Sequence, residues 1–223
     1  MKRRIGILSC CLFSALALGV VTSASASAAA CNTGGGVFTV CSGGEVYLGE
    51  LENKNTAVSS VLKGEVLETP TELKGTTAVA KLKAGEKGTG SGKITFTNIT
   101  VSKPAKCTVK EPVVAEFNVQ ASKVPAPPTA TFTGSKAGEA FTEIEFKNKG
   151  TEECPLKNKV FKVTGSQLAE FDSKIGTEEI NHSVIAKAAG SNLHLGENKA
   201  TFEGTFNEVE TIPTAKPWAL LED

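Results

Sequence analysis

The chain has very little arginine, methionine and aspartate. Its arginines are Arg3 and Arg4, its methionine is Met1, and its aspartates are Asp172 and Asp223. Without arginine after residue 4, there is no guanidinium fork to bind phosphate or carboxylate through two parallel hydrogen bonds. One aspartate inside the fold cannot supply the several carboxylates of an Asp-rich calcium loop. The composition therefore excludes two common kinds of polar binding site.

Aromatic residues and net charge limit the partners further. Trp218 and Tyr47 are the sole tryptophan and tyrosine, so an aromatic platform for sugars is hard to build. The whole chain has 24 basic and 24 acidic residues, and loss of Lys2, Arg3 and Arg4 with a leader would leave 21 against 24, a net charge of −3. Such a surface repels nucleic acid, so we expect no nucleic-acid partner.

The first thirty residues have the three parts of a secretory signal peptide. A basic segment at 2–4 precedes an apolar segment at 5–21 and small residues at 22–30. The apolar segment is short for a membrane span and a long polar chain follows it. We therefore expect residues 1–30 to be removed, no transmembrane segment in the mature chain, and secretion. Cleavage is expected after one of three alanines: Ala26, Ala28 or Ala30.

Cys31 directly after three alanines offers a second mode of export. A cysteine at a new N-terminus is where bacterial lipoproteins carry their lipid, which would anchor the protein on the cell envelope. Ala28 stands where that signal prefers leucine or another large apolar residue. Lipidation of Cys31 therefore remains the alternative to free secretion.

The chain after residue 31 alternates between apolar and polar residues. Residues 113–120, 142–147 and 202–206 each place apolar side chains on one face and polar ones on the other, which is typical of half-buried strands. The apolar parity changes in 94–101, which predicts a bulge near Asn98. The best helical candidate is 166–175. About ten strands separated by Gly-, Lys- and Thr-rich turns predict an all-β fold, an antiparallel β-sandwich of the Ig-like or Greek-key type.

Residues 123–131, KVPAPPTAT, form the Pro-rich segment of the chain. We expect it to be a connection inside a single domain spanning 31–223, because Cys107 and Cys154 lie on opposite sides of it. The alternative is a pair of small β domains divided at this segment.

Four cysteines remain after the leader, and an even number in an exported chain predicts two disulfides. Of the three pairings we favour Cys31–Cys41, which closes a short glycine-rich loop, with Cys107–Cys154, which joins two β-rich segments. Loop-closure entropy predicts stabilisation by about 2.8 and 4.1 kcal/mol.

Other chemistry for Cys154 lacks partners. Zinc sites need clustered ligands, and the sequence has no CxxC or HxxxH spacing. A nucleophilic cysteine needs a histidine, and neither His182 nor His194 lies in a catalytic motif. The flanking Glu152 and Glu153 would raise the pKa of a thiol, which disfavours the reactive thiolate.

One further segment and one further set of residues have the amino-acid types of active sites but lack the spacing that such sites require. KGTGSGK at 87–93 departs from a phosphate-binding loop, and a strand-like run follows it where that motif needs a helix. Asp172, His182 and Ser183 are the residue types of a hydrolase triad without its motif. We therefore predict no catalytic, metal-binding or cofactor-binding residue and no enzymatic activity.

The second half of the chain carries a resemblance. The strings GSGKITFTNITVSKPAKCTVKEPVVAEF, FTEIEFKNKG followed by CPLKNKVFKVTG, and AKPWALLED resemble a group of secreted β-rich proteins that occur as paralogues in soil actinobacteria. The likeness covers roughly residues 88–220. It implies an exported β-sandwich and supplies no catalytic residue.

These observations predict an exported, non-catalytic structural or binding module, secreted or on the cell surface. One alternative is a protein that binds or processes polysaccharide of the cell envelope, which would need Tyr47 or Trp218 on a concave face beside two glutamates. Another is a secreted inhibitor, for which 123–131 is the candidate loop.

Overall fold

The structure is a computed structural model that describes residues 31, 38–122, 127–136, 139–172 and 176–222. The predicted signal peptide and its cleavage positions lie outside the described residues. The described chain is all-β apart from one short 3-10 helix, η1 (Glu86–Gly88). The main sheet consists of β3 (Glu50–Asn55), β4 (Ala57–Val66), β5 (Thr69–Ala84), β6 (Thr89–Lys103), β7 (Cys107–Val109), β8 (Val113–Ala121), β9 (Thr129–Gly134), β10 (Ala140–Asn148), β11 (Val160–Asp172), β12 (His182–Leu195) and β13 (Asn198–Ile212). A small sheet consists of β1 (Phe38–Ser42), β2 (Glu45–Val46) and β14 (Ala219–Glu222).

The 11-stranded main sheet closes on itself. Its strand order is β12-β13-β3-β5-β6-β8-β9-β11-β10-β7, β4 pairs with β13 and β5, and β11 also pairs with β12. Every pairing is antiparallel, as predicted. The expected sandwich is not confirmed, because the β11–β12 pairing makes the strands one continuous sheet instead of two stacked ones.

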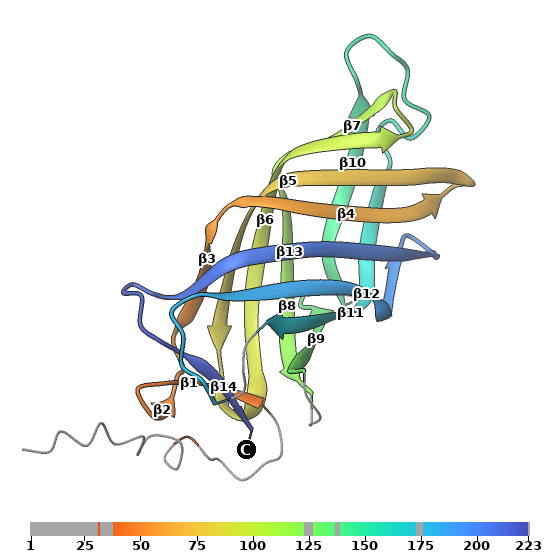
Figure 1. Ribbon diagram of the computed structural model, residues 1–223. Helices are drawn as coiled ribbons and strands as arrows, with labels where there is room; N and C mark the ends of the chain where they lie inside the picture. Colours follow the sequence, from red (N-terminus) through yellow and green to blue (C-terminus); the bar gives the residue numbers. More distant parts are fainter. Residues whose placement is uncertain (1–30, 32–37, 123–126, 137–138, 173–175, 223) are drawn as a thin grey trace, which may run out of the picture.

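The closed sheet is flattened, so that strands from its two sides face each other. In Figure 1, β4, β12 and β13 cross in front of β8, β10 and β11, which run behind them in a different direction. Alternate side chains of these strands point into the space between. Val113, Ala115 and Phe117 of β8 are buried while Asn118 is exposed, which confirms the predicted alternation.

The small sheet covers one end of the main sheet. It lies at the bottom of Figure 1, where the chain also ends. Phe38 of β1 and Leu220 of β14 are buried there and join the core of the main sheet. Trp218, which directly precedes β14, is fully buried, and its Nε1 donates to the main-chain oxygen of Val209 at 3.1 Å. The end of the chain is therefore part of the core.

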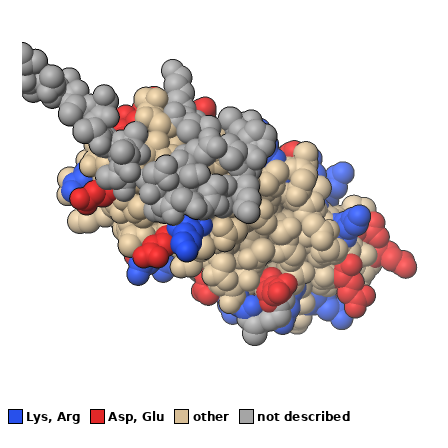
Figure 2. Space-filling view, turned by 90° about the horizontal axis from the view of Figure 1, so that it is seen from below, with Lys and Arg blue, Asp and Glu red and all other residues tan. Residues whose placement is uncertain are grey.

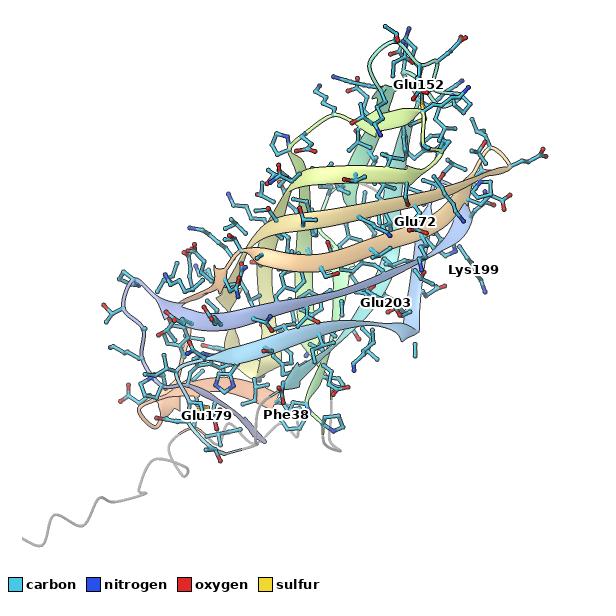
Figure 3. The ribbon with its side chains drawn as sticks, turned by 45° about the horizontal axis from the view of Figure 1, so that its top comes forward. Phe38, Glu72, Glu152, Glu179, Lys199 and Glu203 are labelled. Carbon is cyan, nitrogen blue, oxygen red and sulfur yellow. A yellow bond between two sulfur atoms is a disulfide. The ribbon has the colours of Figure 1, made fainter. Side chains whose placement is uncertain are left out.

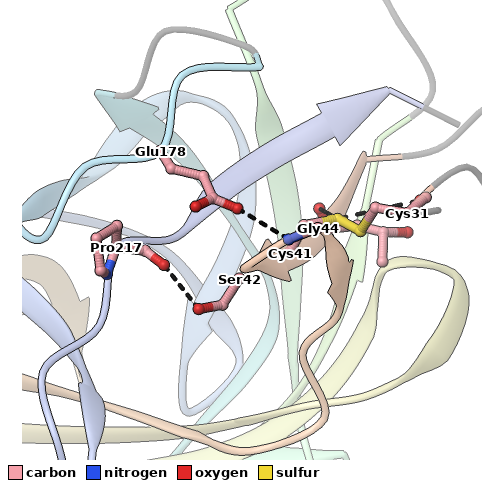
Figure 4. The surroundings of a disulfide bond; sticks show 7 residues. Cys31, Cys41, Ser42, Gly44, Glu178 and Pro217 are labelled. Atoms are coloured by element: carbon pink, nitrogen blue, oxygen red, sulfur yellow. Dashed lines mark hydrogen bonds between the residues drawn. A yellow bond between two sulfur atoms is a disulfide. The ribbon is translucent and has the colours of Figure 1, made fainter. Parts of the chain in front are cut away.

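Two disulfides join the same cysteine pairs that the sequence favours. Cys107 and Cys154 have Cα atoms 4.8 Å apart and fix β7 to the loop after β10. The Cα atoms of Cys31 and Cys41 are 6.2 Å apart, and their disulfide joins Cys31 to β1. Figure 4 shows how the chain after Cys41 is held: Ser42 Oγ donates to the main-chain oxygen of Pro217 at 2.7 Å, and the Gly44 amide donates to Glu178 at 3.3 Å.

The helical candidate at 166–175 is wrong. Residues 166–172 belong to β11, and 173–175 lie outside the described residues. The strand buries Gln167, Ala169 and Phe171 on one face, so a polar glutamine stands where the alternation predicts an apolar residue. Because Gln167 is polar at this inward position, it interrupts the alternation by which a strand is recognised in the sequence. The Pro-rich segment, whose residues 123–126 are also not described, connects β8 and β9, which pair directly with each other.

The outer face is charged with both signs. Lysine and glutamate side chains are interspersed over the visible surface at the end with the small sheet (Figure 2). Glu203 on β13 is exposed, and Figure 3 labels it with Glu72 and Lys199 on the same side of the molecule. Cross-strand pairs such as Glu52–Lys81, at 3.2 Å, lie on this face. In the described part of the chain, no helix has the length and apolar character to cross a membrane.

Candidate ligand cavity

An apolar cavity of about 170 Å³ lies within the main sheet. Its walls come from strands on all sides of the closed sheet, β3 to β6 and β8 to β13. Aliphatic side chains such as Leu51, Leu73 and Ile144 alternate there with aromatic ones. The aromatic lining consists of Phe96, Phe117, Phe132, Phe141, Phe202 and Phe206. Phe117 and Phe132 pack edge to face with ring centroids 5.1 Å apart, and Phe96 and Phe202 do so with centroids 6.0 Å apart.

Most polar side chains that line the cavity already form hydrogen bonds or ion pairs within the protein. Asn53 Nδ2 donates to the main-chain oxygens of Asn55 and Ala78, and its Oδ1 accepts from the Ala80 amide. Ser60 Oγ donates to the oxygen of Gly75 at 3.3 Å. The ammonium of Lys81 pairs with Glu52 on the outer face, so only its aliphatic stem reaches the cavity.

Gln167 of β11 differs from the other polar residues of the wall. It is 6% exposed, and its Nε2 donates to the main-chain oxygens of Leu168 at 2.8 Å and Lys187 at 2.7 Å. Its Oε1 is buried without a hydrogen-bond partner. A buried acceptor without a donor costs about 1 to 3 kcal/mol.

An interruption in β12 lies beside Gln167. The pairing of β11 with β12 shifts between Ser166 and Leu168, and the pairing of β12 with β13 shifts between Ala186 and Leu193. Ser191 secures this excursion: its Oγ donates to the oxygen of Lys187 at 2.6 Å and accepts from the Leu168 amide at 2.8 Å. The strand that faces Gln167 is thus held by side chains where the ladder is broken.

Comparisons with known proteins give no relative. No protein-family model, no curated protein and no solved structure matches this chain. The resemblance to secreted actinobacterial proteins stays a prediction, and the cavity must be interpreted from its own residues.

The residues that resembled a hydrolase triad do not form one. His182 Nε2 lies 2.7 Å from the main-chain oxygen of Trp218, and Ser183 Oγ donates to Asn207 at 3.1 Å. Asp172 is exposed opposite Ser183 on the neighbouring strand. The side chains of His182 and Ser183 therefore bond to groups outside this set of three. Within the described ranges, no three His, Cys, Asp or Glu side chains gather as a metal site.

The two residues considered for sugar binding are engaged in the fold. Trp218 has no exposed surface to offer a sugar. The Tyr47 hydroxyl donates to the main-chain oxygens of Glu50 and Ile212, and burial, followed by the nearby Glu50 charge, raises the pKa of Tyr47 above its ordinary value. On the outer face, a hydrogen bond from Ser102 lowers the pKa of Glu72. Neither shift lies at the cavity.

The sequence did not point to Gln167. The available signal was a polar residue at an inward position, between Val163 and Ala169, in a run that otherwise alternates as a strand. That signal has meaning only after the segment is assigned as β11. The cavity itself combines side chains from ten strands, and no local pattern reports it.

Proposed function

We propose that the protein is an exported, non-catalytic binding module that holds a small apolar ligand inside its main sheet. The observation that carries this proposal is the apolar cavity of about 170 Å³, lined by six phenylalanines and by leucine, isoleucine and valine side chains. Such a lining binds by excluding water from an apolar molecule, without charge and without a metal.

The size of the cavity supports a ligand. Protein interiors are close-packed, with few voids larger than a water molecule. An engineered apolar cavity of about 150 Å³ stays dry and binds benzene, which indicates the size of ligand expected here.

The sequence and the disulfides support a proposed cellular location for the module. We propose secretion as a single domain after removal of residues 1–30. Two disulfides are typical of an oxidising compartment. The sulfur of Cys31 is bonded to Cys41 and is not free to carry a lipid, which favours secretion over a lipid anchor.

A cavity-filling variant tests the proposal. Ala169 is buried on β11 and lines the cavity, so Ala169→Leu places three more carbon atoms in it. We expect toluene to bind the wild type saturably and to raise its melting temperature, as mass action requires. Ala169→Leu should lose that response while its free energy of unfolding stays within about 1.5 kcal/mol of the wild type, because the space is present.

Ala57→Leu is the matched control, since Ala57 is exposed on β4. It should bind toluene as the wild type does. The proposal is wrong if toluene has no saturable effect on the wild type, or if Ala169→Leu responds to toluene like the wild type.

The other candidate functions have less support. Polysaccharide binding lacks its expected aromatic face, because Trp218 is buried and Tyr47 is bonded to the main chain. The loop proposed for an inhibitor lies partly in 123–126, outside the described residues.

A further inference from the structure

We propose that residues 187–192 of β12, which we call the β12 excursion, are the gate through which a ligand enters the apolar cavity. This inference rests on the proposed function, because a gate has a role only if the cavity is a binding site. Three observations carry it: the surplus of residues in β12, their place beside the cavity, and the side-chain contacts that hold them.

The β12 excursion has more residues than the strands on either side of it. On the β13 side, the pairs Ala186–Gly204 and Leu193–Ala200 enclose six residues of β12 and three of β13. On the β11 side, the pairs made by residues 187 and 192 enclose four residues of β12 and one of β11, Gln167. β12 therefore has three surplus residues relative to each neighbour, which give this segment the slack to move.

The excursion lies on the outside of the cavity wall. None of its six residues is buried, and none lines the cavity. The residues next to it do line the cavity: Ala186 and Leu193 of β12, Gln167 of β11 and Phe202 of β13. The backbone of β12 therefore leaves the wall at this point, and side chains of the two neighbouring strands line the cavity there.

Both ends of the closed sheet are filled with buried side chains. Phe38 and Trp218 are buried at the end with the small sheet, and Val109, Phe146 and Leu156 are buried near β7. None of these five residues lines the cavity. Entry through an end would displace this packing, and entry through a continuous part of the wall would break main-chain pairs. At the excursion, the contacts to be broken are those of side chains.

Three side chains hold the excursion closed. Ser191 Oγ donates to the Lys187 oxygen at 2.6 Å and accepts from the Leu168 amide at 2.8 Å, and Gln167 Nε2 donates to the same Lys187 oxygen at 2.7 Å. The Leu168 side chain lies against Gly190, where a Cβ would come within 2.8 Å of Leu168 Cδ2. Gly190 adopts φ 80°, a conformation that glycine reaches without strain. Segments held by few contacts open locally at a lower free energy than the core.

Ser191→Ala loosens this segment without changing the cavity, because Ser191 does not line it. The gate must open both for binding and for release. The association and dissociation rate constants of toluene should therefore both rise about fivefold, as the loss of about one net hydrogen bond predicts, while Kd changes less than twofold. Exchange NMR between free and bound toluene gives the dissociation rate constant, and a titration gives Kd.

Ser102→Ala is the matched control. Ser102 Oγ donates to Glu72 at 2.9 Å where the pairing of β5 with β6 shifts, and Ser102 does not line the cavity. This variant should exchange toluene at the wild-type rates. Leu168→Ala removes the contact with Gly190 and also leaves the cavity lining intact. It should raise both rate constants in the same direction as Ser191→Ala, and it decides the question if Ser191→Ala does not fold.

The outcomes separate the two proposals. If toluene binds the wild type but Ser191→Ala and Leu168→Ala exchange it at the wild-type rates, the gate is wrong and the cavity site stands. The same conclusion follows if Ser102→Ala accelerates exchange as much as they do. If toluene does not bind the wild type, both proposals are wrong.

Discussion

The imidazole of His182 and the indole of Trp218 lie against each other inside the protein. Their ring centroids are 3.9 Å apart at an angle of 56°, and His182 Nε2 lies 2.7 Å from the main-chain oxygen of Trp218. Glu179 also forms a β-bridge with Trp218. Because Trp218 precedes β14, these contacts connect the small sheet to β12 and to the segment before it. This buried pair therefore helps to hold the small sheet against the end of the closed sheet.

Replacement of His182 should weaken the whole fold. His182→Ala removes a buried ring and its contact with the Trp218 oxygen, which keeps the hydrogen bond from the Glu179 amide at 3.0 Å. We expect the free energy of unfolding to fall by about 2 kcal/mol, mainly from the lost packing. Urea unfolding followed by the fluorescence of Trp218, the sole tryptophan, measures this. His194→Ala, on the same strand at a half-buried position, should cost well under half as much. Equal losses in the two variants would show that the contact with Trp218 contributes little.

Removal of the two disulfides should have unequal effects. The Cys107–Cys154 bond closes a loop with a sequence separation of 47, and the Cys31–Cys41 bond one of 10. Loop entropy predicts that the double alanine variants lose about 4.1 and 2.8 kcal/mol respectively. Urea denaturation of each variant against the wild type measures both losses. A larger loss from Cys31 and Cys41 would contradict this order.

The strands with one solvent-exposed face could be predicted because each has its own alternation of apolar and polar residues. In β8 the residues Val113, Ala115, Phe117 and Val119 are buried, and the residues between them are less so. The parity change in β6 also has a structural cause. The bulge predicted near Asn98 is wrong, because β5 and β6 pair there without a register shift. Instead, Asn98 adopts φ 54°, and Phe96 and Ile99 both line the cavity although they are three residues apart.

The closure of the sheet could not be predicted in the same way. It depends on the pairing of β11 with β12, and the strand period of β11 is broken by Gln167. A polar residue on the inner face is costly for folding unless it is bonded, so a pattern analysis assigns it to the outside. A residue that lines the cavity is therefore the one that obscured its strand. Sites of function are where such local rules are expected to fail.

Glu111 should stabilise the distorted part of β6. Its carboxylate accepts hydrogen bonds from the main-chain amides of Asn98 at 2.8 Å and Ile99 at 2.7 Å. Both residues lie in the part of β6 that no longer pairs with β8. Glu111→Ala leaves these amides to water, and we expect a loss of about 1 to 2 kcal/mol in the free energy of unfolding. The amide protons of Asn98 and Ile99 should exchange faster with solvent. Glu153→Ala, at an exposed position, is the control and should change neither quantity.

Tyr47 should titrate above its ordinary pKa in the folded protein. Burial is the main cause and the nearby Glu50 carboxylate adds to it, so both favour the neutral phenol. Because Tyr47 is the sole tyrosine, the ultraviolet absorbance of phenolate reports this group alone. The titration midpoint should lie above about 10 in the native protein and return to about 10 in urea. Glu50→Gln should lower the native midpoint slightly.

The sign of this shift fixes the effect of pH on stability. A group whose pKa is higher in the folded chain contributes its full stabilisation below the unfolded value of about 10 and loses it as pH rises through the folded value. The difference in unfolding free energy between the wild type and Tyr47→Phe should therefore be constant below that pH. Above it, the wild type should lose stability relative to Tyr47→Phe. A difference that stays constant through the alkaline range, or equal midpoints in native protein and urea, would show that Tyr47 is no less solvated in the fold than in the open chain.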